Sequence, residues 1–205
     1  RFEQIKRYNT FSDADSVDHA KFGADLLFKD GLISTFLNGM VKCTGYKPGA
    51  LENRYSSDGV FLYDRLNKSD MEMLELAIRC HNMYRIPQGL NSREQAFCNV
   101  LRDADKVDIF KVNIDTPLEE IYNTTTEELM KSDITDEVLE AFDEEHCILK
   151  AIRRTPADTV IGHVSLAYEL VYDESVRITV EQGYLAKLMH FHSDNEETNR
   201  KMAMV

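Results

Sequence analysis

The first candidate for chemistry is an acidic run, Arg102-Asp103-Ala104-Asp105-Lys106-Val107-Asp108. The residues at helical offsets from Asp105 are apolar, namely Cys98, Leu101, Ile109 and Val112, whereas a separate stripe is polar: Gln95, Asn99, Arg102 and Lys106. A carboxylate directed into a core is destabilising unless a metal ion or a cation binds it. We therefore expect Asp105 to be functional. Asp103 is the alternative, on a more polar side.

Two histidines are expected on similar apolar faces. His81 ends a helical pattern in which the earlier turns carry Leu74, Ala77 and Ile78, and His19 lies beside Phe22, Gly23 and Leu26. Singly, a histidine of this kind is more often a hydrogen-bonded core residue than a ligand. Together with Asp105, His19 and His81 form a His/His/Asp set from three helices, which suits a divalent cation.

Composition narrows the function classes. The chain has 205 residues, 43% of them hydrophobic, and a formal net charge of −12. This length predicts one domain over residues 1–205, or one domain with a small subdomain, and the charge argues against binding to nucleic acid. No run is long enough to span a membrane, and the scattered thiols favour a cytoplasmic protein: Cys43, Cys80, Cys98 and Cys147. The expected partners are a small substrate, no nucleic acid and no membrane; a homodimer is left open.

Hydrophobic periodicity predicts an all-α fold. Helices are expected over Ser16–Lys29, Asp70–Asn82, 92–114, a short segment from Thr126, Thr135–Arg153 with a break left open, Pro156–Tyr172, Ser175–Phe191 and Glu196–Val205. The exception is a Gly-rich and Pro-containing stretch at about 38–68, which predicts a loop-rich insertion. We favour a surface insertion over a lid. Residues 1–115 would carry the site, and 116–205 would complete the bundle.

Four segments in order resemble the HD-domain superfamily of metal-dependent phosphohydrolases: Arg1-Phe2-Glu3-Gln4, Phe11 to Ala20, Ile78-Arg79-Cys80-His81-Asn82, and Leu101 to Asp108. The resemblance spans about residues 1–115. A further segment, Leu166–Leu188, resembles the C-terminal helices of one uncharacterised bacterial branch. The resemblance implies an HD-like helical bundle and a hydrolase that uses a divalent metal, with Mg, Mn, Fe, Zn and Ni as candidates.

The family binds metal through a His, a His-Asp pair and a distant Asp, and Asp105 matches that last Asp. No His-Asp pair occurs in this chain. Relatives of this branch carry the pair in a His-Asp-Ile-Gly-Arg-Phe run, and the present chain opens at its Arg. We therefore expect the missing ligands to lie upstream of Arg1, or to be absent from the protein. His19 and His81 resemble the extra histidines of two-metal members, although His81-Asn82 replaces two adjacent histidines, so one metal is as plausible as two.

The resemblance also suggests roles around the metal. Arg1 matches a substrate-binding Lys of the related HD-GYP phosphodiesterases, and an Arg suits phosphate equally well. Asn82 and Lys106 are further candidates for substrate binding. Asp108 and Asp103 are candidates for carboxylates that orient a metal ligand.

Two functions remain open at this point. The first is hydrolysis of a small phosphate ester, such as a nucleotide or cyclic nucleotide, by metal-activated water, with Arg1 and Asp105 as catalytic residues. The second is a non-catalytic helical protein that keeps the scaffold and binds a nucleotide or a partner. In that alternative Asp105 pairs with a cation such as Arg79.

Overall fold

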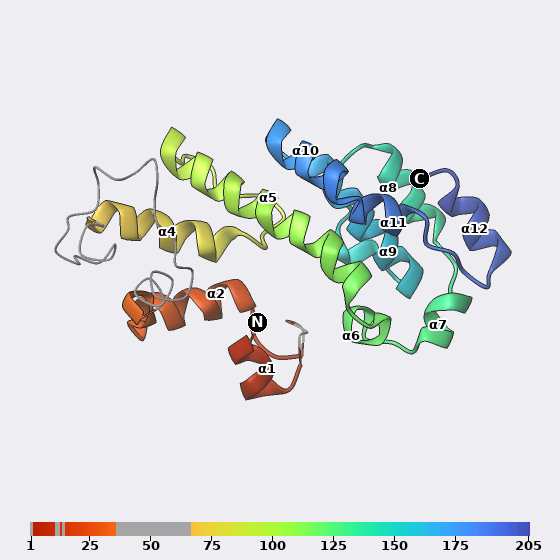
Figure 1. Cartoon of the computed structure of the whole chain (residues 1–205), viewed down its shortest axis with the longest axis horizontal. Helices are drawn as coiled ribbons and strands as arrows, with labels where there is room; N and C mark the ends of the chain where they lie inside the picture. The colour runs from red at the N-terminus through yellow and green to blue at the C-terminus, as the bar shows by residue number, and fades with distance from the viewer. Residues whose placement is uncertain (1, 11–12, 14, 36–66) are drawn as a thin grey trace. The chain divides into compact units, whose positions relative to one another are not determined.

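Every regular element in the described residues is a helix, which confirms the predicted all-α class (Figure 1). The computed structural model describes residues 2–10, 13, 15–35 and 67–205. The predicted insertion at about 38–68 lies almost wholly outside these residues. Contacts between residues divide the chain into two compact units, residues 1–98 and 99–205, where the sequence predicted one domain. Each unit is described by itself.

The first unit is built on a pair of adjacent helices. It contains α1 (Phe2–Tyr8), α2 (His19–Ala24), a π-helical turn η1 (Asp25–Lys29), α4 (Lys68–Cys80) and the first turns of α5 (Ser92–Asp115). Helix α2 packs along α4 (Figure 1). The buried residues of α2 are Ala20 and Ala24, and α4 buries Ala77. Small side chains of this kind allow two helix axes to approach closely.

The ends of these helices follow local hydrogen bonding. The N-cap of α2 is Asp18, whose carboxylate accepts from the backbone N–H groups of Ala20 and Lys21, so the expected start at Ser16 is two residues early. Helix α4 begins with a capping box between Asn67 and Asp70. The helix predicted to end at Lys29 does end there, because the π-helical turn η1 continues α2 to that residue. The sequence did not predict α1.

The second unit holds the main hydrophobic core. It contains the rest of α5, α6 (Leu118–Tyr122), α7 (Thr126–Lys131), α8 (Asp136–Asp143), η4 (Lys150–Ile152), α9 (Pro156–Val164), η5 (Ser165–Glu169), α10 (Asp173–Gln182), α11 (Tyr184–Met189) and α12 (Glu196–Met202). Helix α9 packs against α7, α8 and α11 (Figure 1). Its Val160 and Ile161 are fully buried, together with Leu129, Ile134 and Val138 of the same cluster.

Three predicted helices of this unit are interrupted. The helix that begins at Pro156 changes to a 3-10 helix at Ser165, and the helix from residue 173 breaks at Gly183, whose φ of +68° is in the left-handed region. The break left open between Thr135 and Arg153 is present, since α8 ends at Asp143. The sequence did not predict α6.

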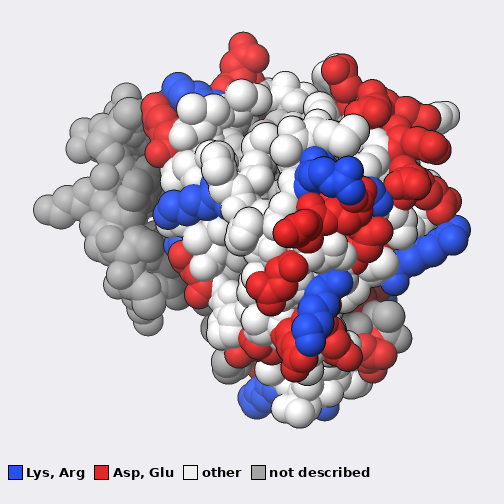
Figure 2. All heavy atoms as spheres, turned by 90° about the vertical axis from the view of Figure 1, so that its right-hand side faces the viewer, with Lys and Arg blue, Asp and Glu red and all other residues white. Residues whose placement is uncertain are grey.

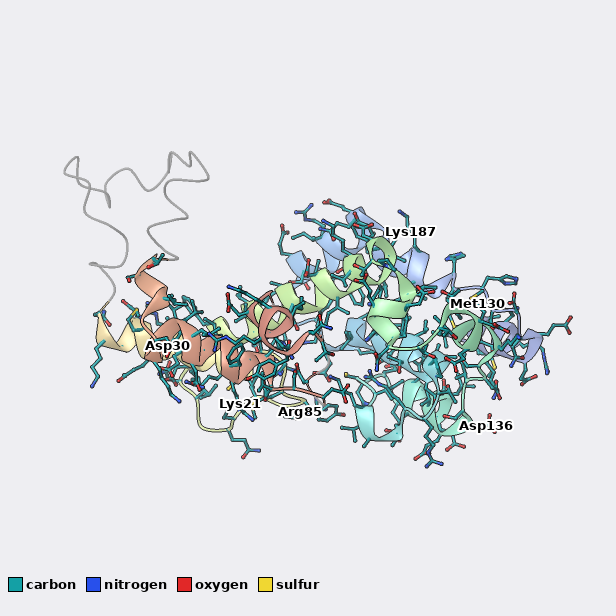
Figure 3. The ribbon with its side chains drawn as sticks, turned by 90° about the horizontal axis from the view of Figure 1, so that it is seen from below. Lys21, Asp30, Arg85, Met130, Asp136 and Lys187 are labelled. Carbon is teal, nitrogen blue, oxygen red and sulfur yellow. The ribbon has the colours of Figure 1, made fainter. Side chains whose placement is uncertain are left out.

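The C-terminal segment is fastened to the region of α7 and α8. The carbonyl of Met130 accepts from Ser193 Oγ at 2.5 Å and from the Asp194 backbone N–H at 2.9 Å, and Lys201 Nζ lies 3.0 Å from Asp136 Oδ1 (Met130 and Asp136 are labelled in Figure 3).

Acidic side chains are spread over much of the face in Figure 2, with Lys and Arg scattered among them. Among the described helices, none has the length and apolarity required to cross a bilayer.

A polar network lies within the second unit. Asn113 Oδ1 accepts from Tyr122 Oη at 2.6 Å and from His163 Nδ1 at 2.9 Å, and the Asn113 amide donates to the Ile109 carbonyl. His163 is thus held by a hydrogen bond to Asn113 within the second unit. Burial, assisted by the positive charges of Arg153 and Lys150, lowers the pKa of His163 to about 3.

This low pKa predicts acid sensitivity. In the unfolded chain His163 binds a proton near pH 6.5, whereas in the folded protein it does so only near pH 3. The free energy of unfolding that depends on neutral His163 is therefore fully present above pH 6.5 and is lost as the pH falls towards 3. His163→Gln, which keeps a donor for Asn113, should remove about 2 kcal/mol of the difference in unfolding free energy between pH 7 and pH 5. Urea unfolding at both pH values measures it; identical pH dependence in the two proteins would contradict the assignment.

Candidate metal centre

The two histidines singled out in the sequence meet in the first unit. His19 is the first residue of α2 and His81 is the C-cap of α4, and their Nε2 atoms lie 3.1 Å apart. The rings are nearly perpendicular, with centroids 5.0 Å apart. Because α2 packs along α4, the start of one helix and the end of the other present their imidazoles to the same point. His19 and His81 thus lie together in the structure.

The hydrogen bonds at the far side of each ring fix where the protons are. His81 Nδ1 lies 2.7 Å from the carbonyl oxygen of Ile78, and His19 Nδ1 lies 2.7 Å from Asp13 Oδ2. A carbonyl and a carboxylate only accept, so both Nδ1 atoms carry hydrogen. In the neutral rings each Nε2 then has a lone pair, and the two Nε2 atoms lie in contact. A proton shared between them, or a metal ion bound by both, would stabilise this contact.

The spacing fits a metal ion of the zinc type. Two imidazole nitrogens that bind one tetrahedral ion at ~2.0–2.1 Å lie about 3.3 Å apart, close to the observed 3.1 Å between the two Nε2 atoms. One further group has potential ligand atoms within 4.8 Å of one another, formed by Asp13, Asp18 and His19. In the structure the carboxylates of Asp13 and Asp18 accept hydrogen bonds from other groups of the protein. We therefore regard them as groups that orient the histidines rather than as metal ligands.

Asp18 joins the two helices beside the histidines. Its Oδ1 accepts from the backbone N–H groups of Ala20 and Lys21 and, at 3.0 Å, from the side-chain amide of Asn82 after α4. Partial burial would raise the pKa of Asp18, but the hydrogen bonds from Lys21 and Asn82 outweigh it and lower the pKa to about 2. Asp18 is therefore ionised at neutral pH and holds the start of α2 against the end of α4.

An ion-pair network holds the same helices one turn further along. Arg79 Nη2 lies 2.5 Å from Asp25 Oδ1 on η1 and 2.7 Å from Glu75 Oε1 on α4. The guanidinium of Arg79 lowers the pKa of the Asp25 carboxyl. Arg79 thus pairs with carboxylates of its own unit, and the ring positions of His19 and His81 are held on both sides.

The predicted orientation of the acidic run is wrong for Asp103. The buried face of α5 in the second unit carries Asp103, Lys106, Phe110 and Asn113 at helical spacing, and Val112 is exposed. Asp103 is 1% exposed, and its carboxylate accepts from the backbone N–H groups of Val171 and Tyr172 at 3.0–3.1 Å. It joins α5 to the start of α10, which is a structural task.

Two residues of the polar stripe predicted on this helix are buried. Arg102 and Lys106 are 9% and 5% exposed, and Arg102 Nη2 lies 3.7 Å from Glu169 Oε2. Burial, followed by the positive charge of Arg102, lowers the pKa of Lys106. Glu169, more than sixty residues away in the sequence, supplies an opposite charge beside these buried cations.

The remaining predicted site residues stand as follows. Asp105 is half-buried and Asp108 is exposed, both on α5 in the second unit. Their roles as a metal ligand and as an orienting carboxylate remain predictions from the sequence, as does substrate binding by Lys106. Arg1 lies outside the described residues.

Gln4 and Asp13 are among the residues of the site that the sequence analysis missed. Gln4 on α1 is fully buried, and its side-chain amide donates to Asp13, which accepts from His19. No spacing rule connects positions 4, 13 and 19, because these residues do not lie on one face of a single helix. The only sequence signal was a polar Gln in the short helical run at the start of the chain.

A stability measurement distinguishes a structural Asp103 from a functional one. Asp103→Ala leaves the Val171 and Tyr172 N–H groups without their buried acceptor, which should lower the free energy of unfolding by roughly 2–4 kcal/mol. Urea unfolding of the variant measures this change. Asp108→Ala on the exposed side of the same helix is the control, and an unchanged midpoint for Asp103→Ala would refute the structural role.

Comparison with known proteins leaves the chain without an assigned family. No family model matches the sequence. No match was found among curated proteins or among solved structures. The resemblance to HD-domain phosphohydrolases therefore rests on the quoted sequence segments, and the function is inferred from the geometry of the histidine pair.

Proposed function

We propose that this protein is a divalent-metal-dependent phosphohydrolase of the HD type that acts on a small phosphate ester. The observation that carries the proposal is the 3.1 Å approach of His19 Nε2 to His81 Nε2, with the Nδ1 hydrogen of each ring given to an acceptor. A pair of imidazoles prepared in this way is a ligand set for a borderline divalent ion. The resemblance of the surrounding segments to HD phosphohydrolases supports the choice of reaction.

His19 and His81 would hold the ion through Nε2. When bound, the ion supplies a Lewis acid and lowers the pKa of water, which is the chemistry that phosphate-ester hydrolysis needs. A bound cation would also offset the acidic character of the chain, whose net charge is −12 and would otherwise repel a phosphate.

The protein's own groups orient the substrate and keep the ligands in place. The Asn82 amide gives one hydrogen to Asp18, which leaves a second N–H donor held next to His81 for a phosphate oxygen. Lys21 Nζ lies 3.1 Å from Asp18 Oδ2 with its side chain 66% exposed, so it adds positive charge at the surface beside the site (Figure 3). These groups favour an anionic ligand.

Metal binding tests the proposal directly. Protein freed of metal and then loaded separately with Zn²⁺, Mn²⁺ and Co²⁺ should retain one of these ions through gel filtration, measured by elemental analysis. His19→Ala and His81→Ala should each weaken binding by more than 100-fold, because loss of a ligand exceeds the 10–100-fold typical of a residue behind a ligand. His190→Ala, an exposed histidine at the end of α11, is the matched control.

Hydrolysis is measured on the same loaded proteins with a phosphate monoester and a diester of p-nitrophenol. Metal-dependent turnover that is lost in His19→Ala and His81→Ala, and kept in His190→Ala, is the expected result. Stoichiometric metal without turnover would favour the non-catalytic binding protein. Asp105→Ala, assayed alongside, measures whether the carboxylate predicted from the sequence contributes to metal retention.

A further inference from the structure

A series of hydrogen bonds runs from Gln4 through Asp13 to the Nδ1 side of the His19 ring, and each bond has a defined donor. The Gln4 side-chain nitrogen donates to Asp13 Oδ1 at 3.0 Å, and also lies 2.9 Å from Ser16 Oγ and 3.1 Å from the Val17 carbonyl. The other oxygen of Asp13 lies 2.7 Å from His19 Nδ1. Gln4 is fully buried, so its amide cannot turn towards solvent to find other partners.

The donors and acceptors in this series determine whether the Nε2 atom of His19 carries a hydrogen or a lone pair. An amide nitrogen only donates and an ionised carboxylate only accepts. Asp13 therefore accepts on both oxygens, from Gln4 and from His19, and the His19 hydrogen is held on Nδ1. The Nε2 lone pair of His19 is thereby kept towards His81, 3.1 Å away.

We propose that Gln4 and Asp13 are positioning residues that hold His19 in the Nδ1–H tautomer, and that this tautomer sets the metal affinity of the histidine pair. The part that concerns metal rests on the proposed function. The part that concerns the tautomer is a property of the metal-free protein. Asp13 acts through His19. Exchanging the acceptor at position 13 for a donor should therefore change the tautomer of the His19 ring while leaving the fold intact.

Asp13→Asn reverses the pattern with almost no change in shape. Gln4 presents its donor nitrogen to position 13, and a second NH₂ group facing it would be unfavourable, so the introduced amide turns its oxygen to Gln4 and its NH₂ group to His19 Nδ1. His19 must then carry its hydrogen on Nε2, where it donates to His81 Nε2 across the existing 3.1 Å. An Asp-to-Asn change beside a histidine can fix the wrong tautomer in this way. The closed pair would no longer offer two lone pairs to a metal.

A double variant restores the original direction. With Gln4→Glu added to Asp13→Asn, the introduced carboxylate accepts from the introduced amide, whose oxygen is then available to His19 Nδ1–H. The net charge equals that of the wild type. Rescue should be partial, because the new carboxylate approaches the Val17 carbonyl, which is 3.1 Å from the Gln4 nitrogen.

The experiment reads the tautomers from long-range ¹H–¹⁵N spectra of the metal-free protein in alkaline buffer. The wild type should show Nδ1–H for both His19 and His81. Asp13→Asn should move His19 to Nε2–H, and the double variant should return it. Asp15→Asn, which removes one acidic charge from the same segment, should change nothing.

Zn²⁺ affinity, measured by competition with a chromogenic chelator, is the second readout. Asp13→Asn should weaken binding by roughly 10–100-fold, and the double variant should recover part of the loss. An Nε2–H tautomer at His19 in the wild type, or an unchanged tautomer in Asp13→Asn, would overturn the proposal. A loss of affinity without a change of tautomer would also overturn it, since Asp13 would then be a ligand. A wild type that binds no Zn²⁺ refutes the proposed function, and the spectra still decide the tautomer.

Discussion

The contact on which the rest of the site depends is the approach of two imidazole nitrogens that both carry lone pairs. His19 Nε2 and His81 Nε2 lie 3.1 Å apart, while Asp13 and the Ile78 carbonyl take the hydrogen on the opposite side of each ring. Two lone pairs at this distance repel, and a proton or a metal ion bound by both nitrogens would remove the repulsion. The folding of the first unit therefore places two potential nitrogen ligands at one defined point.

The surrounding structure can be understood as the means of maintaining that contact. Small buried residues allow α2 to pack along α4, namely Ala20, Ala24 and Ala77. Asp18 joins the start of α2 to Asn82, and Arg79 joins η1 to α4. Each of these links draws together chain segments more than fifty residues apart, so the two rings are fixed by hydrogen bonds and ion pairs on both sides of them.

The sequence predicted the parts of the structure that depend on local pattern. The helical periodicity placed most helices, and the apolar neighbours of His19 and His81 identified both residues. The sequence failed where a distant partner decides the outcome. Asp103 was assigned to a polar side of α5, but the backbone N–H groups of Val171 and Tyr172 make its burial favourable. Gln4 could not be found, because its function depends on a loop that brings Asp13 to it.

The central claim is that the histidine pair binds a metal ion through its two Nε2 atoms. X-ray absorption spectroscopy of the Zn²⁺-loaded protein at the zinc edge measures it most directly. The account predicts the multiple-scattering pattern of two imidazoles with Zn–N distances of about 2.0–2.1 Å, reduced to one imidazole in His81→Ala. A spectrum with oxygen ligands alone, or one that His81→Ala leaves unchanged, would contradict it.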